Sequence, residues 1–97
     1  MTKIVINRCH GGFGLSEKAQ NLYIERKGIS EEDAQYWFAS EVDRDDPLLV
    51  QIVEELGVEA DGEFARLKIV EIPNDVEWFV DEYDGLEWVA EVHRTWS

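Results

Sequence analysis

The spacing of hydrophobic residues divides the chain into strand-like ends and a helical middle. Near the N-terminus, residues 3–9 carry an Ile-Val-Ile run that is typical of a buried strand. Three glycines follow directly, and Ser16 is a suitable N-cap for a helix that begins at Glu17. We therefore expect a strand, a glycine-rich turn and a helix in the first third of the chain.

Two apolar stripes at helical spacing predict the main helices. The first is expected over residues 17–27, where Gly28 is a suitable C-terminal stop. The second is expected over residues 47–56, because Asp46 can cap it, proline suits the first helical position and Gly57 ends the run. Their apolar faces consist of Ala19, Leu22 and Tyr23 in the first helix and of Leu48, Leu49, Ile52, Val53 and Leu56 in the second.

The segments beside the second helix are less regular. Ser30 is followed by three acids, which predicts a short helical turn. The aromatic residues over 34–42 favour an irregular or extended course after that turn. Residues 58–63 are expected to form a loop or a frayed continuation of the second helix.

The last third predicts three strands. Residues 67–72 are apolar, residues 76–83 alternate, and a final strand returns over residues 86–94. Between the last two strands, Asp-Gly at 84–85 is a strong signal for a two-residue hairpin turn. The whole pattern predicts an α+β fold: an N-terminal strand, two to three helices and a C-terminal three-stranded antiparallel meander, in one sheet with helices on one face.

The length and composition fit one soluble domain. Ninety-seven residues with 44% hydrophobic content suffice for one packed core, so we expect a single domain over residues 1–97. No apolar run approaches the roughly 20 residues of a membrane span, and the N-terminus lacks the pattern of a secretion signal. The single cysteine excludes an internal disulfide, and a reducing cytoplasm fits this usage.

The net charge of −13 is unevenly distributed. Residues 1–30 carry five bases against two acids, a net +3, whereas residues 31–97 carry a net −16. Most of the surface would repel phosphates, so direct binding to nucleic acid is not expected, and a basic protein is a natural partner. A small anionic molecule would have to bind near the N-terminal end.

The glycine turn is the candidate site for such an anion. Its spacing matches neither the dinucleotide fingerprint nor the phosphate loop, but it can aim backbone N–H groups at an anion beside a helix start. The alternative is a tight turn in which glycine supplies positive φ angles. A guanidinium beside an indole in the C-terminal tail can also stack on a ring. The expected ligand-binding residues are Asn7, Arg8, His10, Gly11, Gly12, Phe13, Gly14, Ser16, Lys18, Arg94 and Trp96.

Neither a catalytic residue nor a metal site is expected. Cys9 and His10 are adjacent on a strand and point to opposite faces, so they cannot pair as nucleophile and base. Together with His93 they lack the paired spacing of a zinc site. The acids around Asp45 lack the glycine and the distal glutamate of a calcium loop. We therefore expect no cofactor, and an enzyme is the least supported class of function.

An acidic and aromatic segment fills the C-terminal third. Between Ile69 and His93 there are eight acids, four aromatic residues and no lysine or arginine. Such a surface can imitate the phosphates of a duplex and occupy a basic groove on another protein. The alternative is a solvated face that keeps a small protein soluble. The expected protein-binding residues are Glu77, Asp81, Glu82, Asp84 and Glu87.

Seven motifs occur together along the chain: Asn7-Arg-Cys-His-Gly-Gly-Phe-Gly-Leu-Ser16, Arg44-Asp-Asp-Pro47, Val53-Glu-Glu-Leu-Gly57, Leu67-Lys-Ile-Val-Glu-Ile-Pro73, Val76-Glu-Trp78, Glu82-Tyr-Asp-Gly85 and His93-Arg-Thr-Trp96. Together they resemble a family of small uncharacterised bacteriophage proteins. The resemblance implies a setting and no particular activity: a small soluble protein in the bacterial cytoplasm during infection. Such proteins often block a host defence protein, sometimes by resembling DNA, or sequester a nucleotide-derived immune signal.

Two functional hypotheses follow. In the first, a non-enzymatic protein captures a small anionic, nucleotide-derived ligand at the glycine turn. A domain this small rarely encloses a whole ligand, so the pocket is expected between copies of the chain in a homo-oligomer. In the second, the acidic segment binds and blocks a basic host protein.

Overall fold

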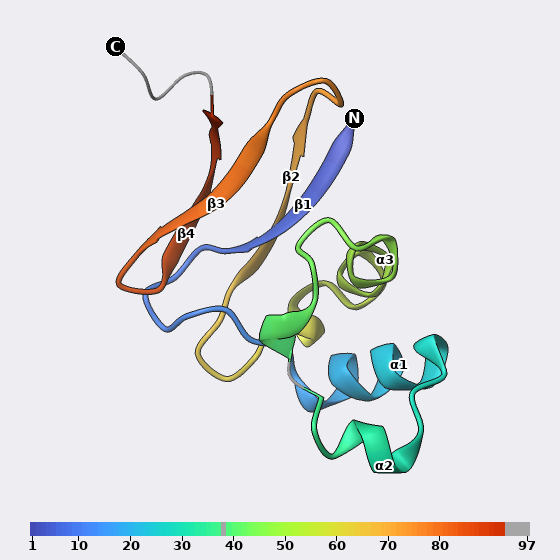
Figure 1. Cartoon of the computed structure of the whole chain (residues 1–97). Helices are drawn as coiled ribbons and strands as arrows, with labels where there is room; N and C mark the ends of the chain where they lie inside the picture. Colours follow the sequence, from blue (N-terminus) through green and yellow to red (C-terminus); the bar gives the residue numbers. More distant parts are fainter. Residues whose placement is uncertain (38, 93–97) are drawn as a thin grey trace.

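The computed structural model describes residues 1–37 and 39–92, and its elements form three layers (Figure 1). The strands β1 and β2 pair in the middle, α3 packs on one side of this pair with α1 against α3, and the β3–β4 hairpin covers the other side. The elements in chain order are β1 (Thr2–Asn7), α1 (Glu17–Lys27), α2 (Glu31–Ala34), η1 (Ala39–Glu41), α3 (Pro47–Leu56), η2 (Gly57–Ala60), β2 (Leu67–Ile72), β3 (Trp78–Tyr83) and β4 (Leu86–Glu91).

Both long helices begin and end where the sequence predicts. The Ser16 side chain accepts a hydrogen bond from the third residue of α1, and Gly28 ends that helix with a φ of +76°. Asp46 caps α3 in the same way, and the cap residue Gly57 donates its N–H to Val53 O. The short helix α2 and the 3-10 segments η1 and η2 also agree with the predicted turn, irregular course and frayed continuation.

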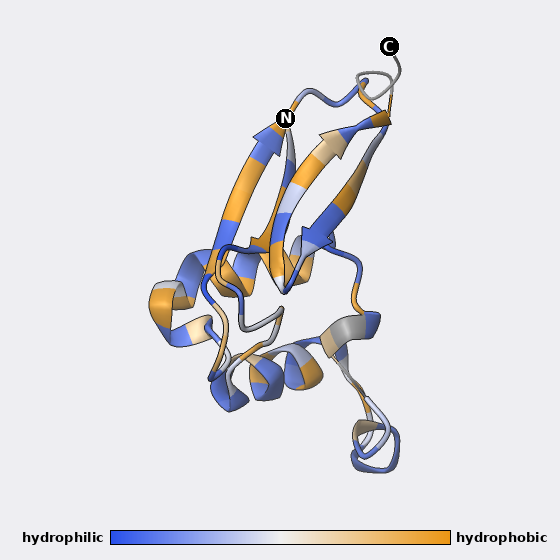
Figure 2. Ribbon diagram, turned by 90° about the vertical axis from the view of Figure 1, so that its left-hand side faces the viewer, coloured by the Kyte–Doolittle hydropathy of each residue, from blue (hydrophilic) through white to orange (hydrophobic). Residues whose placement is uncertain are grey.

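Alternate side chains of β1 belong to two separate cores. Val5 lies in the core shared with the helices, beside Leu49 and Ile52. Ile4 and Ile6 lie in the core beneath the hairpin. All of these side chains are buried, which explains why the strand is continuously apolar. Figure 2 shows hydrophobic and hydrophilic residues alternating along the strands.

The expected three-stranded meander is wrong in its pairing. β2 pairs antiparallel with β1, whereas β3 and β4 form a second two-stranded sheet. Both faces of β1 are apolar and need to be covered. The hairpin therefore packs over Ile4 and Ile6 and does not pair with the edge of β2. The predicted hairpin turn itself is confirmed, since Asp84 and Gly85 have φ angles of 51° and 90°, as in a type I′ turn. The last strand, expected to reach residue 94, is described through Glu91.

A partly buried hydrogen bond joins α1 to the start of α3. The Tyr23 hydroxyl donates to Asp46 Oδ2 at 2.7 Å. Burial, together with the hydrogen bond to this carboxylate, raises the pKa of Tyr23 to about 12. Burial alone would raise the pKa of Asp46, but the hydrogen bonds from Tyr23 and from two backbone N–H groups outweigh it and lower that pKa. Both shifts favour the neutral phenol beside the ionised carboxylate.

Candidate functional site

The glycine turn packs closely against the loop that follows η2. A Cβ on Gly11 would overlap the backbone carbonyl of Phe64, and a Cβ on Gly62 would lie 2.8 Å from the backbone of Gly14. Gly12 has open space around it and a φ of +98°, which L side chains rarely adopt. Packing therefore accounts for Gly11 and conformation for Gly12.

The first turn of α1 is occupied by contacts with η2. Ser16 donates its hydroxyl to Glu59 O at 2.6 Å and its backbone N–H to Ala60 O at 2.9 Å. The same hydroxyl accepts the N–H of Ala19 at 3.1 Å. Lys18 forms an exposed ion pair with the Glu59 carboxylate at 3.4 Å. The groups that were expected to hold an anion at this helix start thus have partners within the protein.

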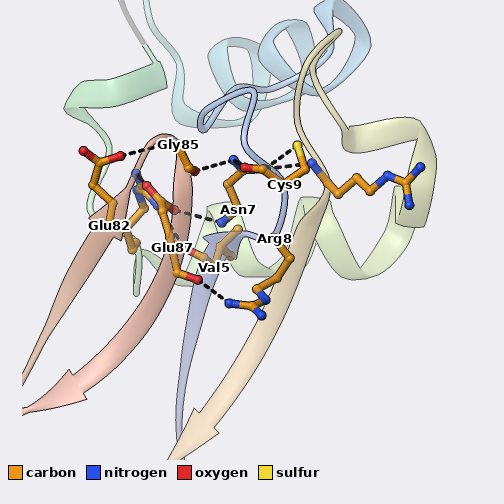
Figure 3. Close-up of polar contacts among 9 residues, drawn as sticks. Val5, Asn7, Arg8, Cys9, Glu82, Gly85 and Glu87 are labelled. Atoms are coloured by element: carbon orange, nitrogen blue, oxygen red, sulfur yellow. Dashed lines mark hydrogen bonds and ion pairs between the residues drawn. The ribbon is translucent and has the colours of Figure 1, made fainter.

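Asn7 joins three segments that are distant in the sequence (Figure 3). Its side-chain amide donates to Cys9 O at 2.7 Å and to Gly85 O at 2.8 Å, and its Oδ1 accepts the backbone N–H of Arg66 at 2.8 Å. The residue is completely buried. Asn7 therefore holds the glycine turn, the start of β2 and the hairpin turn together.

A buried ion pair anchors the hairpin to the middle layer. The Glu87 side chain, in a residue only 6% exposed, accepts from Arg44 Nη2 at 2.8 Å and from the backbone N–H of Asn7 at 2.8 Å. The Arg44 guanidinium also lies over the Phe13 ring, 3.6 Å from its centroid. Glu87 was expected on a protein-binding surface, but its position makes it a structural residue. Its carboxylate needs Arg44 because an unpaired charge is costly in the interior.

Of the other residues expected at the anion site, those that the structure describes do not converge on one point. His10 is exposed in the turn. Arg8 extends to the hairpin, where its Nη1 donates to a main-chain carbonyl of β4 at 2.7 Å. Lys18 lies at η2 instead. Arg94 and Trp96 lie outside the described residues.

The side of the hairpin that faces away from β1 and β2 carries a compact aromatic group. In the hairpin register Asp81 lies opposite Trp88, and Phe79 and Tyr83 are the two diagonal neighbours of Trp88. Phe79 is 40% exposed, Tyr83 72% and Trp88 38%. We call these four residues the outer face.

Exposed carboxylates lie along the hairpin and at its turn. Glu77, Asp81, Glu82 and Asp84 are all exposed. Two of them also support the local backbone, because Asp81 Oδ1 accepts the N–H of Glu82 and Glu82 Oε2 accepts the N–H of Gly85, both at 2.9 Å. Four of the five residues expected to bind a protein are therefore exposed.

Arg44 and Lys68 were not among the residues predicted to be functional. Arg44 is the only base in an acidic run over residues 41–46, which is a signal for a structural ion pair. Lys68 interrupts the apolar strand β2 and lies opposite Ile6, which points its side chain to the hairpin side. Within residues 1–37 and 39–92, no ion pair forms at Lys68 and no group of three or more metal-ligating side chains is gathered.

No protein-family model, curated protein or solved structure matches this chain. Among the described residues, no helix has the length and apolar character needed to span a bilayer. The outer face exposes three aromatic side chains, whereas the glycine turn packs against the loop that follows η2.

Proposed function

We propose that this chain is a non-enzymatic binding protein that docks on a basic protein surface through the outer face of its hairpin. The observation that carries the proposal is the contiguous exposure of Phe79, Tyr83 and Trp88 around Asp81. Aromatic side chains lose little conformational entropy on binding and are enriched at the centres of protein interfaces.

The charge favours a basic partner. The chain has a net charge of −13, and exposed acids border the aromatic group. Such an arrangement accelerates encounter with a positive surface and disfavours acidic partners. The resemblance to small phage proteins suggests a host defence protein as the partner, blocked where it would otherwise bind a phosphate backbone. A homo-oligomer remains a prediction of the ligand-capture hypothesis.

Site-specific photocrosslinking tests the proposal, since Tyr83 has a matched control. Tyr36 is 73% exposed and Tyr83 72%, and Tyr36 follows α2, away from the hairpin. A photoreactive phenylalanine at each position, irradiated in bacterial extract, should give a basic protein crosslinked at position 83 and not at 36. Excess unmodified protein should suppress that product. Equal crosslinking at both positions, or none at 83, would contradict the proposal.

A further inference from the structure

The buried ion pair of this chain shows how a ring and a carboxylate together hold an arginine. The Arg44 guanidinium lies 3.6 Å from the centroid of the Phe13 ring, and its Nη2 donates to Glu87 Oε2 at 2.8 Å. A guanidinium suits both contacts, because it is planar and weakly hydrated and can donate from its edge while its face stacks on a ring. The protein satisfies an arginine of its own in this way.

The outer face presents the same kinds of group, a carboxylate and aromatic rings. Asp81 lies directly opposite Trp88, which places their Cβ atoms roughly 5 Å apart. Phe79 and Tyr83 precede and follow Asp81 by two positions on β3, so their side chains leave the same side of the strand. One carboxylate and three rings therefore stand next to one another on one side of the hairpin.

These groups hold no cation within the described part of the chain. Among residues 1–37 and 39–92, no ring pair and no cation–π contact involves the three outer rings. Asp81 belongs to none of the ion pairs in the same ranges. Its Oδ1 accepts the N–H of Glu82 at 2.9 Å, which orients the carboxylate. The outer face thus has the ring and the oriented carboxylate of the buried pair, but not the guanidinium.

We infer that the outer face holds an arginine side chain of its basic partner, with the guanidinium stacked on the aromatic rings and paired with Asp81. This inference rests on the proposed function, because it names the side chain that the same surface recognises. The net charge of −13 makes a cation the complementary occupant. Arginine is favoured over lysine, because an ammonium is a strongly hydrated point charge, whereas a guanidinium stacks on rings and donates two parallel hydrogen bonds to a carboxylate.

Two short capped peptides of equal length and equal charge test the inference. Glycine alternates with arginine in one peptide and with lysine in the other. In an NMR titration of the full chain, the arginine peptide should bind at least about fivefold more tightly than the lysine peptide. The amide shifts that it causes should fall on residues 79, 81, 83 and 88.

A matched pair of variants separates recognition by Asp81 from the overall charge of the protein. Asp81→Asn removes the charge and keeps an Oδ1 that can accept the N–H of Glu82. It should reduce the preference for arginine to about twofold or less, because the charge-assisted contact is lost. Asp75→Asn removes one charge by the same substitution at an exposed position in the turn before β3. It should leave the preference for arginine at its wild-type value.

Three results would overturn the inference: equal affinities for the two peptides, no binding of the arginine peptide below about 5 mM, or a preference that the Asp81→Asn and Asp75→Asn variants change equally. Amide shifts confined to residues outside the hairpin would also overturn it. Photocrosslinking at position 83 reports on the proposed function separately. A basic protein crosslinked there, together with equal affinities for the two peptides, would overturn the arginine inference alone.

Discussion

The two faces of the β3–β4 hairpin share one backbone and differ in what their side chains contact. On the inner face, Trp78, Val80 and Val89 pack on the isoleucines of β1, and Glu87 is locked to Arg44. On the outer face, Phe79 and Tyr83 are exposed. Both faces mix aromatic and acidic residues, so composition alone does not distinguish them.

Side chains on the inner face of the hairpin stabilise the fold, whereas those on the outer face are free to serve in recognition. An acid on the inner face has to be paired, because burial without a partner is costly. An aromatic residue on the outer face adds little to folding, because it stays in water. Substitutions on the two faces should therefore have different effects. Those on the inner face should destabilise the fold, and those on the outer face should weaken binding and leave the fold intact.

The largest effect is expected from breaking the buried ion pair. Glu87→Ala leaves the Arg44 guanidinium without its carboxylate, and Arg44→Ala strands the carboxylate. Either change should lower the free energy of unfolding by about 3–5 kcal/mol, as measured by urea titration. In the exposed pair, Lys18→Ala should cost about 0–1 kcal/mol. Equal losses for the buried and exposed pairs would remove the structural role of Glu87.

A glycine series should give the next largest effects. Ala at Gly11 overlaps the Phe64 carbonyl, and Ala at Gly85 overlaps the His10 carbonyl in a position of positive φ. Each should cost about 2–3 kcal/mol, because backbone atoms cannot move aside cheaply. Gly12→Ala meets open space and carries only the strain of its φ angle, so it should cost about 1 kcal/mol. Thermal unfolding ranks the three, and a reversed order would contradict the packing described here.

Removing one tyrosine hydroxyl from the helical core and one from the outer face should give a smaller difference in the free energy of unfolding. Tyr23→Phe deletes the partly buried hydrogen bond to Asp46 and should cost about 1 kcal/mol. Tyr83→Phe deletes an exposed hydroxyl and should cost nothing measurable. Chemical denaturation of both variants checks this, and a loss at Tyr83 that matches the loss at Tyr23 would show that the outer face is structural.

The pH dependence of stability should follow the same contact. The pKa of Tyr23 is raised to about 12 in the folded protein, so its contribution is complete below pH about 10 and is lost as pH rises toward 12. The pKa of Asp46 is lowered, so its contribution is present above pH about 4 and is lost as pH falls through the folded-state value. Tyr23→Phe should remove the alkaline loss and reduce the acidic one.

The smallest effect on stability is expected from the outer face. Phe79→Ser and Tyr83→Ser together should change the free energy of unfolding by no more than about 1 kcal/mol, because both side chains remain largely in water. Circular dichroism should show an unchanged spectrum. A loss above about 2 kcal/mol would mean that these aromatic residues support the hairpin itself.

Local signals explain why the helices could be predicted. The helix caps act on backbone groups within a few residues, so they can be recognised in a short stretch of sequence. These caps are Ser16, Gly28, Asp46 and Gly57. The hairpin turn at 84–85 is equally local. The Ile-Val-Ile run of β1 indicated burial on two sides.

Long-range partners explain what could not be predicted. The pairing of β1 with β2 joins residues about sixty-five positions apart, and an equally apolar β3 offered a plausible alternative partner. Arg44 and Glu87 are separated by 43 positions, so nothing near Glu87 distinguishes it from the exposed acids around it.

The dissociation constant of the protein captured at position 83 tests the central claim most directly. It should be measured for the wild type, for the Phe79→Ser and Tyr83→Ser double variant, and for Tyr36→Ser, each at low and high salt. We predict that the double variant binds at least about 100-fold more weakly, that Tyr36→Ser binds like the wild type, and that added salt weakens wild-type binding. Equal affinity for the wild type and the double variant would contradict the claim that the outer face is the docking surface.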